Sequence, residues 1–259
     1  MLNSIILGVV EGATEFLPVS STGHLLIVES LMGDHRSDAF NVLVQVGPIL
    51  ASALVFRQRI FDWFLKFGDP SVRKEIYQIL LAFLITGVGG LILEKSGLKL
   101  PESVLPVAIA TLLGVPVILL VERRAIKNQP TGGFSWSLAL AMAAAQLLAA
   151  AFPGTSRSGA CVMAGLLIGA SRSSAVEFSF LVGIPTMFAA GGYKLLGEVR
   201  HGNLRELTSA DSIVAFIVAT VVAFFVVRWL LGYVRSRSFI PFAWYRLALG
   251  VGLLVWALL

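Results

Sequence analysis

The chain of 259 residues is 57% hydrophobic and 14% charged, whereas a typical soluble domain is about 25% charged. This deficit excludes an ordinary water-soluble domain, because most of the surface must face lipid. The single cysteine, Cys161, excludes an internal disulfide framework and a thiolate metal site. The net charge of +5 comes from basic residues that lie between apolar runs, as topology anchors of membrane proteins do, so we expect no nucleic acid as a partner.

The first half of the chain predicts a broken hairpin followed by three membrane spans. Residues 2–32 are apolar but are interrupted at 17–23 by Leu-Pro-Val-Ser-Ser-Thr-Gly, which indicates two short helices joined by a polar turn. No basic segment or cleavage site precedes them, so we expect them to belong to the mature fold. Three charge-free stretches then follow at 39–56, 76–93 and 103–121, each close to the roughly 20 residues that a bilayer requires.

The second half repeats this order. Residues 134–170 are broken at 152–159 by Phe-Pro-Gly-Thr-Ser-Arg-Ser-Gly, and spans follow at about 174–197, 212–231 and 241–259. Non-helical backbone survives at membrane depth only when it is buried in protein or lines a wet cavity. Both broken segments are therefore interpreted as re-entrant helical hairpins, in an all-α integral membrane protein with six transmembrane helices.

The two halves also resemble each other in sequence. Aligning Pro18 with Pro153 places Ser20 and Ser21 on Thr155 and Ser156. Val-Gly-Pro-Ile at 46–49 then matches Val-Gly-Ile-Pro at 182–185 with a slip of one residue. These matches indicate an internal repeat.

We predict a single membrane domain, 1–259, made of repeat one, 1–127, and repeat two, 128–259. Each repeat has three spans after its hairpin, and an odd number of spans inverts the second copy relative to the first. The two hairpins are then expected to enter from opposite faces and to meet near the midplane, as in inverted-repeat transporters.

The charges of the connections orient this topology. One set of connections is strongly basic and holds Arg57, Arg59, Lys66, Arg73, Lys74, Arg123, Arg124, Lys127, Arg228, Arg235 and Arg237. The other set is balanced, with Lys95, Lys99, Lys194, Arg200 and Arg205 against Glu94, Glu102, Glu198, Glu206 and Asp211. Because basic loops stay in the cytoplasm, we expect both termini and the start of the first hairpin to lie outside.

Glu11 and Glu15 are the first candidate site residues. They are four residues apart, so a helix places both carboxylates on one face. Two carboxylates inside an apolar membrane helix are expensive, which indicates a function. The pair can hold a hard divalent cation, which prefers oxygen ligands, or one carboxyl can stay protonated and shuttle protons. The structural alternative is a pair exposed to water at the membrane interface.

Three hydroxyl side chains and a histidine follow the acidic pair. Ser20, Ser21 and Thr22 can supply a nucleophile or hydrogen bonds to phosphate oxygens, although hydroxyls also cap helices. His24 titrates near neutrality and can act as a nucleophile or as a general acid or base. Our mechanistic hypothesis is attack by Ser21 while His24 takes its proton, and His24 as the direct nucleophile is the alternative.

Arg157 is the centre of the second candidate site segment, after a stretch without charge from 128 to 156. Its planar fork suits bidentate binding of phosphate oxygens. Thr155, Ser156 and Ser158 can add hydrogen bonds, and the N-terminus of the returning helix favours an anion. The structural alternative is a salt bridge from Arg157 to the acidic pair. With the first segment, this inventory is typical of phosphoryl transfer.

Residues 11–24 and 153–159 resemble the motifs of the undecaprenyl-pyrophosphate phosphatase family known as the bacitracin-resistance protein. Length, hydropathy and repeat layout fit that family over essentially the whole chain. The resemblance implies metal-dependent hydrolysis of undecaprenyl pyrophosphate to undecaprenyl phosphate, which recycles this lipid carrier for cell-wall synthesis, with Mg²⁺ or Ca²⁺ as cofactor. It also implies a bacterial inner-membrane protein whose active site opens toward the periplasmic face. The active-site residues that it implies are Glu11, Glu15, Ser21, His24, Ser156 and Arg157.

One departure and several alternatives accompany this interpretation. The family's second motif commonly ends in threonine where this chain has Cys161, which puts a hydroxyl role there in doubt, although cysteine is small enough to pack in its place. A polyprenyl-phosphate transporter or flippase is the main alternative, because opposed hairpins in inverted repeats are a transporter layout. Phosphatidic-acid-type phosphatases need a second histidine shortly after the arginine, and the chain has none shortly after Arg157. A P-loop needs a lysine in its turn, and neither polar turn holds one. The oligomeric state stays open, a homodimer included.

Overall fold

The computed structural model describes residues 1–97 and 103–258, and its regular structure there is helical. Lys99, Glu102 and Leu259, which the sequence interpretation used, lie outside the described residues. The helices in chain order are α1 (Leu2–Thr14), α2 (Ser21–Met32), α3 (Asp38–Val55), α4 (Arg57–Leu65), α5 (Pro70–Ser96), α6 (Val104–Asn128), α7 (Trp136–Ala151), α8 (Arg157–Leu167), α9 (Arg172–Arg200), α10 (Leu204–Leu207), α11 (Ala210–Tyr233) and α12 (Ile240–Leu258).

Six of these helices, α3, α5, α6, α9, α11 and α12, are long and apolar enough to cross a membrane. They confirm the six predicted spans, and the chain is a multi-pass membrane protein. Several helices extend beyond the apolar run that revealed them. Helix α5, for example, begins at Pro70 because Asp69 caps it, accepting a hydrogen bond from the Ser71 amide at 2.8 Å, and because proline suits the first helical position.

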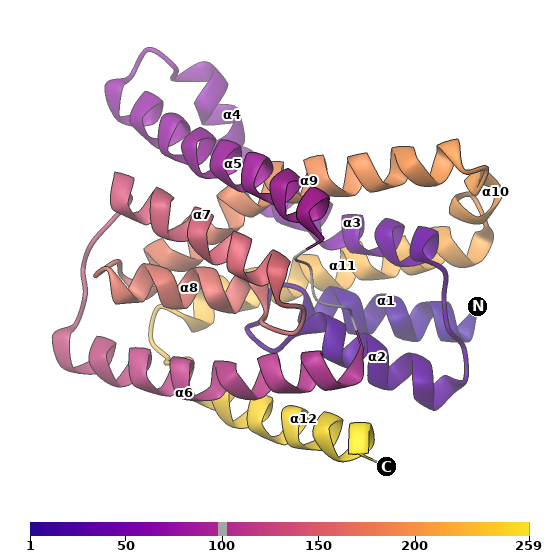
Figure 1. The fold of residues 1–259 in the computed structure, drawn as a ribbon. Helices are drawn as coiled ribbons and strands as arrows, with labels where there is room; N and C mark the ends of the chain where they lie inside the picture. The colour runs from indigo at the N-terminus through magenta and orange to yellow at the C-terminus, as the bar shows by residue number, and fades with distance from the viewer. Residues whose placement is uncertain (98–102, 259) are drawn as a thin grey trace.

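The two broken segments are pairs of short helices, α1 with α2 and α7 with α8. Helix α1 begins at the right of Figure 1 and α7 begins at the left, so the two pairs enter the bundle from opposite ends. Their re-entrant insertion into a bilayer stays a prediction. Helices α4 and α10 lie in connections for which the sequence interpretation expected no helix.

Some of the helix contacts recur when each helix is matched with the helix six places later. Helix α1 packs on α11 as α7 packs on α5, α3 packs on α11 as α9 packs on α5, and α2 packs on α12 as α8 packs on α6. Helices α3 and α9 contact each other, as do α6 and α12. The internal repeat and its inverted orientation across a membrane stay predictions.

Small residues bring α1 close to α11. A Cβ built on Gly8 or Gly12 would lie 2.6 or 2.5 Å from the carbonyl oxygen of Ala215 or Ala219, respectively. Small residues four apart allow such close backbone approach between helices in lipid. Because α1 carries Glu11 and leads to Glu15, this contact fixes the acidic pair against the second half of the molecule.

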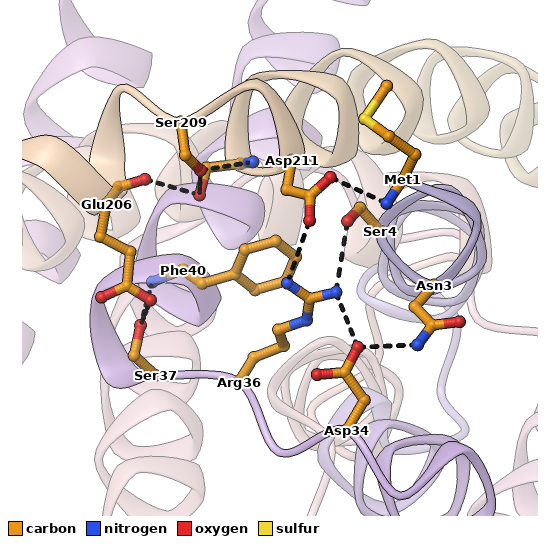
Figure 2. A network of polar contacts seen from close by, with 11 residues as sticks. Met1, Asn3, Ser4, Asp34, Arg36, Ser37, Phe40, Glu206, Ser209 and Asp211 are labelled. Atoms are coloured by element: carbon orange, nitrogen blue, oxygen red, sulfur yellow. Dashed lines mark hydrogen bonds and ion pairs between the residues drawn. The ribbon is translucent and has the colours of Figure 1, made fainter.

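A polar network closes the end of the molecule that holds the N-terminus (Figure 2). The amino group of Met1 pairs with Asp211 at 2.8 Å, and Arg36 bonds Asp34 at 2.7 Å and Asp211 at 3.4 Å. Arg36 also donates to Ser4 of α1. The network joins α1, the α2–α3 connection and the start of α11.

Candidate active site

The two hairpin loops meet near the middle of the bundle (Figure 1). The hydroxyls of Ser156 and Ser158 both donate to the carbonyl oxygen of Leu17, at 3.3 and 3.1 Å. The loop between α7 and α8 is thereby bonded directly to the loop between α1 and α2. Side chains that lie 142 residues apart in the sequence come into contact there.

Ser20 and Ser156 occupy equivalent positions in these loops. Each precedes a short helix as its N-cap and accepts a hydrogen bond from the glycine amide three residues later, at 3.3 Å from Gly23 and 3.2 Å from Gly159. Their φ angles of 74° and 65° are in the left-handed region, where a residue other than glycine is strained by about 1–3 kcal/mol, typically at functional sites. The structural equivalence pairs Ser20 with Ser156 rather than with Thr155.

Glu15 lies between Ser21 and Arg157. The Ser21 hydroxyl donates to Glu15 Oε2 at 2.8 Å, and Nη2 of Arg157 lies 3.4 Å from Oε1. The salt bridge that was the structural alternative for Arg157 is therefore present. A carboxylate that already accepts the serine hydrogen bond is placed to take its proton.

His24 is held by two partners other than Ser21. Its Nδ1 lies 2.7 Å from the carbonyl oxygen of Ser20, and its Nε2 lies 2.7 Å from the hydroxyl of Tyr245 in α12, whose ring stacks on the imidazole. Because a carbonyl only accepts, Nδ1 carries the hydrogen and the Tyr245 hydroxyl donates to Nε2. This favours Glu15 over His24 as the acceptor of the Ser21 proton. No pattern in the sequence singled out Tyr245.

Buried polar atoms of the site lack partners in the described part of the chain. Both carboxylate oxygens of Glu11 and Nε of Arg157 are buried without a hydrogen bond. Glu11 is fully buried and its carboxylate interacts with that of Glu15. Buried polar atoms normally have hydrogen-bond partners. The free oxygens of Glu11, together with Glu15, therefore fit a divalent cation, and the free Nε of Arg157 fits a phosphate oxygen. Within residues 1–97 and 103–258, no group of three or more His, Cys, Asp or Glu side chains could hold a metal, so further ligands would come from other groups.

Gly183 makes room for Arg157. A Cβ built on Gly183 in α9 would lie 2.5 Å from Nη1 of Arg157, and the guanidinium stands 6.0 Å from the ring centre of Phe16. In the sequence, Gly183 stands out only as part of the repeat match. Its position in that match, opposite Gly47, was the available signal.

The remaining candidates lie around these groups. Thr155 donates to the carbonyl of Phe152 at 2.7 Å, Ser158 is buried beside Ser156, and Thr22 is half-buried in the first turn of α2. The roles of these hydroxyls, and of Ser20 and Ser156, in phosphate binding stay predictions. Cys161 is buried, with its Sγ 3.9 Å from the carbonyl oxygen of Met142.

An apolar groove adjoins the second loop. Its volume is about 1000 Å³, and side chains of α6, α7 and α8 line it, including those of Leu113, Ala144 and Met163. Thr155 and Arg246 also belong to its lining. The apolar groove therefore reaches the loop that precedes Arg157.

Comparison with known proteins points to one family. Residues 4–252 match the family model described as bacitracin resistance protein BacA. An undecaprenyl-diphosphatase from Rhizobium etli is 46% identical over 254 residues, which is 98% of this chain and 96% of the relative. One from Xanthomonas axonopodis pv. citri is 46% identical over 257 residues, 99% of this chain and 97% of the relative. These names describe a phosphatase and give no support to the transporter alternative.

Proposed function

Because the chain belongs to the family of the bacitracin resistance protein BacA, we propose that it is an undecaprenyl-diphosphatase. It hydrolyses undecaprenyl pyrophosphate to undecaprenyl phosphate and inorganic phosphate, which recycles the lipid carrier for cell-wall synthesis and gives resistance to bacitracin. The observation that carries the proposal is the contact of Glu15 with both Ser21 and Arg157. That contact joins a nucleophile, a base and a phosphate ligand from the two halves of the chain.

The reaction proceeds by two displacements at phosphorus. Arg157 turns from Glu15 to the terminal phosphate, and Ser21 Oγ attacks that phosphorus while Glu15 takes its proton. The bond from phosphorus to the bridging oxygen breaks and undecaprenyl phosphate leaves. Water then attacks the phosphoserine, and the bond from phosphorus to Oγ breaks while Glu15 returns its proton to Oγ. Inorganic phosphate leaves with the oxygen and the protons of the water. Positioning and charge neutralisation supply most of the catalysis in such transfers.

His24 is the alternative nucleophile. Its Nε2 accepts from Tyr245, so attack by His24 requires that bond to open, whereas Ser21 already contacts its base. A rapid quench with substrate labelled in the terminal phosphate distinguishes the two. We expect an acid-stable phosphoserine at Ser21; an acid-labile phosphohistidine would identify His24 instead.

Glu11 and Glu15 are the residues that would hold a divalent cation, Mg²⁺ or Ca²⁺. When bound, the cation supplies positive charge that offsets the charge of the pyrophosphate. Glu11 is the stronger ligand candidate, because both oxygens of Glu15 are engaged, whereas those of Glu11 have no hydrogen-bond partner among residues 1–97 and 103–258.

The prenyl tail occupies the apolar groove between α6, α7 and α8. The lining of the groove is predominantly apolar and reaches Thr155, two residues before Arg157. A tail in the groove would place its pyrophosphate beside the second loop.

We further propose that the protein lies in the bacterial inner membrane with its site open to the periplasmic face. The α6–α7 connection, next to the basic Arg123, Arg124 and Lys127, lies at the left of Figure 1, and both termini lie at the right. Basic connections stay on the cytoplasmic side, so the end of the molecule that holds both termini faces the periplasm.

Release of inorganic phosphate from undecaprenyl pyrophosphate by the purified protein in detergent tests the function. We expect multiple turnovers. A folded protein that releases no phosphate would refute the hydrolase and return the transporter alternative to consideration, because a transporter alone leaves the anhydride bond intact.

A further inference from the structure

Arg246 is a buried cation in α12 that the proposed chemistry does not use. Its side chain is 1% exposed, and no charged partner is found for it in the described part of the chain. An unpaired cation inside a membrane helix is expensive and usually has a function. The bonds that it makes indicate what that function is.

Every N–H group of the guanidinium meets a backbone carbonyl. Nε donates to Thr111 at 3.1 Å, Nη1 donates to Thr155 at 3.1 Å and to Pro18 at 3.4 Å, and Nη2 donates to Ala110 at 3.1 Å and to Gly154 at 3.2 Å. A guanidinium has five N–H donors in a fixed fork, so none remains for a phosphate. Arg246 is therefore not a substrate ligand.

We propose that Arg246 is a positioning residue, which holds the two hairpin loops at a fixed separation on α6. Pro18 lies in the loop that leads to Ser21, and Thr155 lies in the loop that leads to Arg157. The same nitrogen, Nη1, bonds both carbonyls. The bridge thus joins the loop of the nucleophile to the loop of the phosphate ligand. This inference rests on the proposed function of the site.

The surrounding backbone is shaped for this bridge. A Cβ built on Gly114 of α6 would lie 2.7 Å from Cζ of Arg246, so the glycine leaves space for the guanidinium. Gly154 has a φ of +91°, and a Cβ there would lie 2.6 Å from the carbonyl oxygen of Val107. The second loop therefore lies directly on α6, at the point where Arg246 binds it.

Arg246→Lys tests whether the hydrogen bonds of the guanidinium, rather than its positive charge, hold the two loops. Lysine keeps the positive charge but has three donors on a flexible stem and no planar fork, so it cannot bind all five carbonyls. We expect kcat to fall about 100-fold, because loss of the bridge lets the two loops shift and a displacement of about 1 Å in a reacting group has an effect of this size. KM is expected to change little, because the groups that contact substrate are all still present.

Arg172→Lys is the matched control. Arg172 in α9 donates from Nε to the buried Glu122 at 3.0 Å, and Glu122 also accepts the Phe239 amide. The bond joins α9 to α6 and to the start of α12 without contacting either hairpin loop. We expect the control to unfold at a lower temperature and to keep its kcat.

The experiment measures kcat, KM, the unfolding temperature and amide hydrogen exchange for both lysine variants and the wild type in detergent. The inference predicts a selective loss of kcat in Arg246→Lys, with faster exchange in residues 15–22 and 152–158. A folded Arg246→Lys with wild-type kcat and exchange would overturn it. If Arg246→Lys and Arg172→Lys both lost kcat in proportion to the fall in their unfolding temperatures, the loss would reflect stability alone and would also overturn the inference.

Gly114→Ala covers the case in which Arg246→Lys does not fold. It removes no donor and no charge but pushes the guanidinium from its place, so kcat should fall and exchange in both loops should rise. Wild-type kcat in this variant would contradict the inference. If the wild type itself released no phosphate, the proposed function would fail, and hydrogen exchange alone would then decide whether Arg246 holds the loops.

Discussion

Gly183→Ala tests whether the position of Arg157 sets the rate. A Cβ at this position would lie 2.5 Å from Nη1 of Arg157, whereas ordinary contact begins at 3.4 Å, so the guanidinium must move by about 0.9 Å. The moving atom is the end of a flexible side chain, and α9 itself need not change. A misplacement of about 1 Å can slow a reaction about 100-fold, which corresponds to about 2.7 kcal/mol in the barrier.

The assay is phosphate release from undecaprenyl pyrophosphate in detergent, together with thermal unfolding. Gly192→Ala in the same helix is the control, since nothing lies within 4 Å of a Cβ there. Alanine is the better helix former by about 1 kcal/mol, so this variant should be at least as stable as the wild type and equally active. A folded Gly183→Ala with the turnover of Gly192→Ala would refute the reasoning.

Three further results are expected at the site. Glu15→Gln should lower kcat about 100- to 10,000-fold, because the amide cannot take the Ser21 proton. A loss of less than about tenfold in the rate of phosphate release would show that another group is the base. Ala144→Trp should fill the apolar groove and raise KM for the C55 substrate far more than for a short-chain pyrophosphate, and equal effects on both would place the tail elsewhere. A chelator should abolish phosphate release, with recovery on adding Mg²⁺ or Ca²⁺, and full activity in its presence would exclude a divalent cation at Glu11.

The spans were predictable because the bilayer imposes a length and a composition on them. The apolar runs at 103–121 and 212–231 correspond to α6 and α11. Helix α6 continues past its run through charged residues to Asn128, and α11 is longer than its run by two residues at each end. Helix α4 escaped prediction because it has only 9 residues and because Arg57, Arg59 and Asp62 interrupt its apolar side chains. Its boundary with α3 is a single residue, Phe56.

Residues of the site were predictable where a charge or a cluster of hydroxyls interrupts an apolar segment of the sequence. Charges and a proline-broken hydroxyl cluster identified Glu15, Ser21 and Arg157, which lie in contact. Tyr245 and Arg246 were not predicted as site residues, since their partners are a distant imidazole and backbone carbonyls. Backbone carbonyls leave no trace in a sequence, so only the fold reveals such contacts.

The central claim is that hydrolysis takes place where the two hairpin loops meet, and Arg157→Ala tests it most directly. The measurement is phosphate release by the purified variant, with its unfolding temperature as the check on folding. We expect a folded protein with almost no turnover, because removal of the guanidinium leaves the terminal phosphate without its ligand. Normal turnover in the folded variant would place the reaction elsewhere and contradict the account.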